Sequence, residues 1–189
     1  MNYTDLLNQA EYVTRELITI VNTSFAPLSY DALYKHPEPG KWSAAECFEH
    51  LNSYHAYYNK AFRLQIEKAK KNPLNRTKTH KSTWLGKWAV RSVHPDAIAK
   101  KMNAVKQHNH KEKTITADVL KRYLKNCEEF LELIEASREI DLQKTKVRIE
   151  IMKMLRLNLG DFYFFMLRHD QRHVLQASNA CGLGITFCK

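Results

Sequence analysis

The sequence has few of the residues that interrupt regular secondary structure. Its 189 residues include only five glycines and five prolines. Proteins with many strands need more of both for their tight turns, so this scarcity favours long helices joined by few connections. The length suits one folding unit, and we expect residues 1–189 to form a single domain.

Signals for other classes of protein are also missing. No apolar run approaches the roughly 18 residues that a membrane-spanning helix requires. The first residues lack a charged segment followed by an apolar one, so we expect no signal peptide and a cytoplasmic location. The four cysteines form no CxxC pair. We therefore interpret Cys47 and Cys127 as small apolar core residues.

Positive charge is concentrated in the middle of the chain. Residues 68–125 contain 16 Lys and Arg against three acidic residues, a net charge of +13, whereas the remainder carries −3. Such a segment favours an anionic partner or substrate. Because it also contains Trp84 and Trp88, contact with nucleic acid through phosphates and stacked bases is one alternative.

Four segments have apolar residues at spacings of three and four, which predicts four amphipathic helices. They are residues 4–23, 43–71, 116–137 and 158–180. Asn2 or Thr4 is expected to cap the first helix. The second begins with a capping box, in which Ser43 and Glu46 satisfy each other's backbone N–H groups.

The connections between these helices differ greatly in length. Residues 72–115 are too long for a turn and fit a crossover between parallel helices, in which residues 84–90 are expected either to form a short helix or to pack as a lid. Residues 138–157 are interpreted as either a short helix or an extended connection. We identify no strand, so the sequence predicts an all-α fold, a four-helix bundle with a long basic crossover between its second and third helices.

Three histidines are candidates for a metal site. His169 and His173 are four residues apart, which places them on one helix face about 6 Å apart along the axis, within reach of one ion at about 2.1 Å. They share that face with Phe162 and Phe165, and a histidine among apolar residues must be hydrogen-bonded, neutral or ligated. His50 occupies a similar place on the second helix. The competing interpretation is that all three are structural histidines.

Residues near these histidines have less certain roles. Glu46 is expected to cap its helix, although it could also face the site. Gln176 follows His173 by three residues and is positioned to orient it. Asp170 is expected to be a solvated surface acid, and residues 108–113 a solvated loop. His55 lies too far around its helix to share an ion with His50.

Two motifs resemble those of one family. Residues 42–51, WSAAECFEHL, resemble the WSxxExxxHL segment of the DinB-like superfamily, and residues 169–176 resemble its HxxxHxxQ motif. The resemblance implies an up-down-down-up four-helix bundle, often a homodimer. It also implies a nickel, zinc or iron ion bound by His50, His169 and His173. Characterised relatives include transferases and isomerases that use the thiols bacillithiol or mycothiol, and many members have no assigned activity.

The sequence leaves two functions open. The first is a metal-dependent enzyme acting on a small molecule, either a transferase that uses a low-molecular-weight thiol or a hydrolase. We identify no serine or cysteine nucleophile beside the histidines, which fits a nucleophile supplied by the metal. The second is a non-catalytic metal- or anion-binding bundle, associated with nucleic acid through the basic residues 68–125. The family motifs do not explain the basic segment 72–115.

Overall fold

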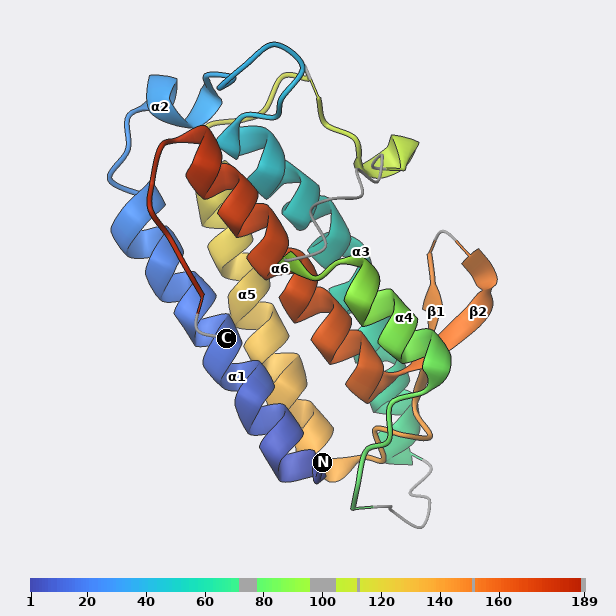
Figure 1. The fold of residues 1–189 in the computed structure, drawn as a ribbon. Helices are drawn as coiled ribbons and strands as arrows, with labels where there is room; N and C mark the ends of the chain where they lie inside the picture. Colours follow the sequence, from blue (N-terminus) through green and yellow to red (C-terminus); the bar gives the residue numbers. More distant parts are fainter. Residues whose placement is uncertain (72–77, 96–104, 112, 151, 188–189) are drawn as a thin grey trace.

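The computed structural model describes residues 1–71, 78–95, 105–111, 113–150 and 152–187, and four long helices make up most of them (Figure 1). Both α1 and α3 contact α5 and α6, so the four helices enclose a shared interior. Each lies where the apolar spacing predicts a helix. The four helices are α1 (Tyr3–Ile20), α3 (Ala44–Lys71), α5 (Val119–Ala136) and α6 (Leu159–Ala180).

Polar side chains fix where three of these helices begin. The Asn2 side chain accepts from the Asp5 N–H at the start of α1, at 2.7 Å. At α3, the Ser43 N–H donates to Glu46 Oε2 (2.7 Å) and the Glu46 N–H donates to Ser43 Oγ (3.2 Å), which confirms the capping box. The Asn158 side chain caps α6 in the same way as Asn2 caps α1. These bonds satisfy N–H groups that a helix start otherwise leaves without partners.

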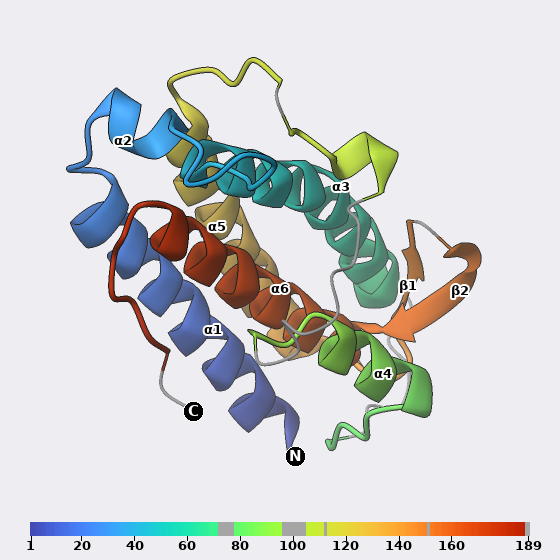
Figure 2. The ribbon, with the colours of Figure 1, turned by 45° about the horizontal axis from the view of Figure 1, so that its top comes forward.

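Shorter helices connect the long ones. The short helix expected near residues 84–90 is α4, which packs along α6 (Figure 2). The prediction of a crossover over residues 72–115 falls partly on residues 72–77, 96–104 and 112, which lie outside the described part of the chain. The remaining short helices are η1 (Val21–Phe25), α2 (Tyr30–Tyr34), α4 (Trp84–Ser92), η3 (Lys106–His108) and η4 (Ser137–Glu139).

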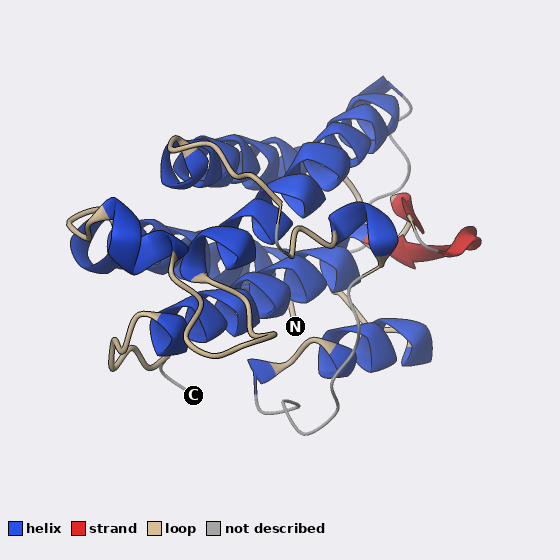
Figure 3. Cartoon of the chain, turned by 90° about the horizontal axis from the view of Figure 1, so that it is seen from above, coloured by secondary structure: helices blue, strands red, loops and turns tan. Residues whose placement is uncertain are grey.

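A small antiparallel hairpin departs from the all-α prediction. Strands β1 (Lys146–Ile149) and β2 (Met152–Asn158) pair with Val147 opposite Leu157, and they lie at one edge of the helices (Figure 3). Of the two interpretations of residues 138–157, the short helix is therefore wrong for residues 146–149 and 152–158, and the extended connection agrees with the strands. The described part of the chain is mostly helical with one two-stranded sheet, and β2 leads directly into α6.

The interior between the helices is strongly apolar. Its largest fully buried side chains are aromatic and include Phe48, Phe62, Phe130 and Tyr163. Burying such side chains contributes roughly 1.5–3 kcal/mol each. Cys47 and Cys127 are buried free cysteines, as expected. Among the described residues, none of the helices is both long enough and apolar enough to cross a membrane.

Candidate metal centre

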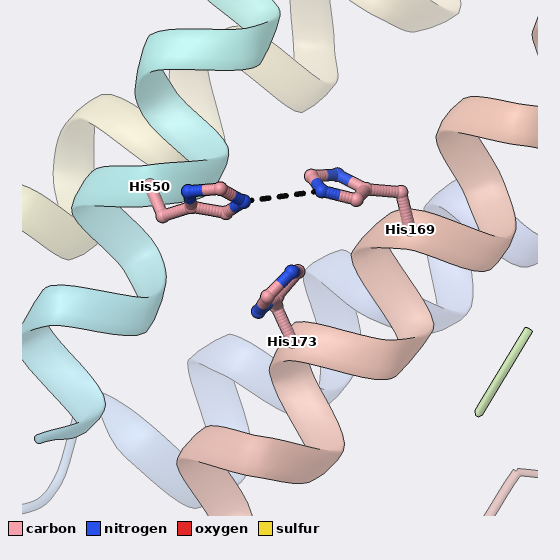
Figure 4. Close-up of side chains that lie close together, drawn as sticks. All are labelled: His50, His169 and His173. Atoms are coloured by element: carbon pink, nitrogen blue, oxygen red, sulfur yellow. Dashed lines mark hydrogen bonds between the residues drawn. The ribbon is translucent and has the colours of Figure 1, made fainter. Parts of the chain in front are cut away.

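The three predicted histidines meet between two helices. His50 projects from α3 toward His169 and His173 on α6 (Figure 4). The Nε2 atoms of His50 and His169 are 3.1 Å apart, and one ligand nitrogen from each of the three lies within 4.8 Å of the other two. The geometry therefore brings together three donors suited to one ion. Metal binding itself stays a prediction.

The surroundings of these histidines favour their neutral form. His50 and His169 are buried and His173 is partly buried. Burial lowers the pKa of His50 to about 4. Burial also lowers the pKa values of His169 and His173 well below their usual range, and the neighbouring imidazoles act in the same direction. At neutral pH all three rings are uncharged, which is the form in which histidine binds metals.

Hydrogen bonds fix the tautomers of two of the rings. His50 Nδ1–H donates to the His108 carbonyl at 2.7 Å, which leaves a lone pair on His50 Nε2. His173 Nδ1–H donates to Gln176 Oε1 at 3.0 Å, as the sequence suggested, and leaves a lone pair on its Nε2. Outer partners of this kind commonly orient metal-binding histidines.

The donor set fits a divalent transition metal. Three neutral imidazoles suit nickel, zinc or iron, and three protein ligands leave a coordination position open. His169 Nδ1 is buried without a partner among the described residues. A cation held between the three rings would interact with the lone pairs that His50 and His173 keep on Nε2.

His108 of η3 and Glu150 in the turn of the hairpin form hydrogen bonds that support His50. The ring of His108 lies between Ser53 Oγ and Glu150 Oε2, at 2.8 Å from each. This network holds the backbone carbonyl that accepts from His50. The expectation that His108 is solvated was wrong, because the ring is 4% exposed and packs against Tyr54 with 4.1 Å between ring centroids.

The histidines open onto a cavity of about 790 Å³. This volume falls within the range of small-molecule sites. The ring of Trp42, which precedes the capping box of α3, has its centroid 5.1 Å from that of His50 and 5.9 Å from that of His173. Aromatic rings and a few charged groups form much of the wall: Trp42, Tyr54, Trp88, Phe165, Lys41, Lys111, Glu150 and Arg172.

A second polar cluster lies behind the site, in the core. Asp170 is 2% exposed, so its predicted place on the solvated surface was wrong. Its Oδ2 lies 2.8 Å from His55 Nε2 and accepts from the Tyr123 hydroxyl at 3.3 Å. Burial opposes a charge on His55, but Asp170, with smaller contributions from Asn59 and Glu129, raises the pKa of His55 overall. His55 and Asp170 form a buried hydrogen-bonded pair between α3 and α6.

Cys127 lies beside this pair. One possible metal-ligating atom from each of His55, Cys127 and Asp170 lies within 4.8 Å of the other two, which makes this the second such group in the described chain. Burial raises the pKa of the Cys127 thiol well above its usual value, whereas metals bind the thiolate. His55 does not join the group formed by His50, as expected. We interpret the second cluster as part of the packed core.

Comparison with known proteins identifies the family. A family model described as the DinB superfamily matches residues 14–177. No curated protein and no solved structure matches the chain. The matched range contains His50, His169 and His173 together with nearly all of α6. The chain therefore belongs to the DinB superfamily.

Proposed function

We propose that this protein is a metal-dependent enzyme that acts on a small molecule, with one nickel, zinc or iron ion held by His50, His169 and His173. One observation carries the proposal: three neutral imidazoles from two helices converge at the wall of a cavity. Such an ion would lower the pKa of a water or thiol bound to it and polarise an electrophile.

The fold supports the same proposal. The contacts among α1, α3, α5 and α6 agree with an up-down-down-up four-helix bundle formed by residues 1–189 as one domain. In that arrangement α3 and α6 are neighbours. The contact between them is what allows their histidines to share an ion.

The nucleophile is expected to come from outside the chain. No cysteine is among the described residues that line the cavity, and the Ser92 hydroxyl donates to the Ala89 carbonyl at 2.7 Å. Water or a low-molecular-weight thiol would then be the attacking group. The reaction would accordingly be hydrolysis or thiol transfer.

Tyr54 is the residue best placed to donate a hydrogen bond to a bound substrate. Its ring packs on His169 and His50, with centroids 4.3 and 4.9 Å apart, and it lines the cavity. Burial and the nearby charge of Glu150 raise the pKa of Tyr54 to about 12. The hydroxyl therefore keeps its proton at neutral pH, and it has no partner among the described residues.

The proposal is tested by assaying untagged protein loaded separately with Ni²⁺, Zn²⁺ and Fe²⁺. Two panels are needed: thiol conjugation with bacillithiol, mycothiol and glutathione, and hydrolysis of esters and amides. We expect activity that requires metal and is lost in His50→Ala. His36→Gln is the matched control, because His36 bonds Glu46 and is not among the residues that line the cavity. Equal activity in wild type and His50→Ala would contradict the proposal.

A non-catalytic, nucleic-acid-associated bundle is the second candidate. It is favoured by the exposed side chains of Trp84 and Trp88, 80% and 53% accessible, on a helix that also carries Lys87 and Arg91. Fluorescence anisotropy with labelled single-stranded DNA and RNA at low salt tests it. Binding that weakens with added salt and in Trp84→Ala would support this candidate, and an absence of binding would eliminate it.

A further inference from the structure

Arg172 is a cation at the cavity wall that has no acidic partner among the described residues. It lies on α6 three residues after His169 and one before His173, and it lines the cavity. Its single hydrogen bond to a described residue is a long one, from Nη1–H to the His94 carbonyl at 3.5 Å. The Arg172 side chain is partly buried at this position.

Some other arginines of the described chain have carboxylate partners, namely Arg15, Arg63, Arg122 and Arg138, whereas Arg168 bonds the neutral Gln171. Arg122 donates to Glu49 at 2.6 Å, Arg138 to Glu11 at 3.0 Å, and both also meet a second carboxylate. A partly desolvated guanidinium without such a partner is costly. Its five N–H groups form a planar fork that matches a carboxylate or phosphate. An anionic ligand would supply the partner that the described residues do not.

The rest of the cavity fits the same kind of ligand. Lys41 and Lys111 also line it, against the acids Glu38 and Glu150, and Glu150 is already bonded to His108. The wall formed by Trp42, Trp88 and Phe165 suits a compact apolar body. A molecule with one anionic end and an apolar or aromatic body could contact both the basic and the aromatic residues of the wall.

We propose that Arg172 binds the carboxylate or phosphate of the substrate and so places the remainder of the molecule beside His50, His169 and His173. The chemistry at the histidines rests on the proposed function. The anion site does not, because Arg172 needs no metal to bind a carboxylate. The two ideas can therefore be tested separately.

Binding of simple probes to chelator-treated protein tests this inference, with tryptophan fluorescence as the readout because Trp42 and Trp88 line the cavity. The probes are benzoate and phenyl phosphate, with neutral benzamide for comparison. We expect wild type to bind at least one anion tenfold or more tightly than benzamide. Arg172→Gln should lose that preference, and Arg172→Lys should retain part of it. The preference of one anion over the other identifies a carboxylate or a phosphate site.

Arg168→Gln is the matched control, because Arg168 lies one turn earlier on α6, bonds Gln171 and is not among the residues that line the cavity. It should behave as wild type, and circular dichroism checks that every variant folds. The inference is overturned if neither anion binds more tightly than benzamide, or if Arg172→Gln and Arg172→Lys both keep the full preference. Metal content, measured separately, shows whether the proposed function fails independently.

Discussion

The histidine cluster should make the metal-free protein unusually sensitive to acid. Burial lowers the pKa of His50 to about 4 from an ordinary 6.5. As pH falls below about 6.5, the unfolded chain takes up a proton at this residue before the folded chain does, so stability is lost. At pH 5 the difference between these two pKa values lowers the free energy of unfolding by about 2 kcal/mol, counting His50 alone. The lowered pKa values of His169 and His173 act in the same direction.

The assay is urea unfolding in EDTA, followed by circular dichroism at pH 7.5 and pH 5.0. In His50→Gln, the loss of unfolding free energy between the two pH values should be about 2 kcal/mol smaller than in wild type. The raised pKa of His55 contributes stability that is present at low pH and lost as pH rises, and this effect is common to both proteins. An equal acid-induced loss in the two proteins would refute the reasoning.

Three further outcomes are expected. Asp170→Asn removes the carboxylate that bonds the buried His55 ring. Because we expect both groups to be charged, the change should lower the unfolding free energy by about 3–5 kcal/mol, and a loss below about 1 kcal/mol in urea titration would argue against an ion pair. Glu150→Gln removes a hydrogen-bond partner of His108, whose carbonyl orients the candidate ligand His50. The change should weaken Zn²⁺ affinity about tenfold by calorimetry, whereas unchanged affinity would mean that Glu150 is not needed to position His50. Ser43→Ala removes the capping hydroxyl of α3 and should cost about 0.5–2 kcal/mol, which a thermal scan detects, and no change would mean that the cap contributes little.

Local signals in the sequence predict much of the fold and the candidate site. The capping box places the start of α3 correctly, because Ser43 and Glu46 act within one helical turn. The i, i+4 spacing of His169 and His173 puts both on one face whatever surrounds them. Helix periodicity alone does not specify which helices become neighbours. The meeting of His50 with His169 and His173 was expected from the resemblance of residues 42–51 and 169–176 to the two family motifs.

The features that the sequence did not yield depend on contacts between distant segments. Asp170 is buried because its carboxylate meets His55 of α3 and Tyr123 of α5 in the interior of the bundle. His108 is buried because its loop meets Ser53 of α3 and Glu150 after β1. The hairpin had a signal, the alternation of Val147 and Ile149 with charged residues, but one too short to outweigh the helical pattern around it.

The metal content of untagged protein tests the central claim most directly. Wild type, His50→Ala and Cys127→Ser are each incubated with Ni²⁺, Zn²⁺ or Fe²⁺, desalted and analysed by plasma mass spectrometry. The account predicts one bound ion per chain in wild type and in Cys127→Ser, and almost none in His50→Ala. Wild type that stays metal-free with all three ions, or His50→Ala that binds as much as wild type, would contradict it.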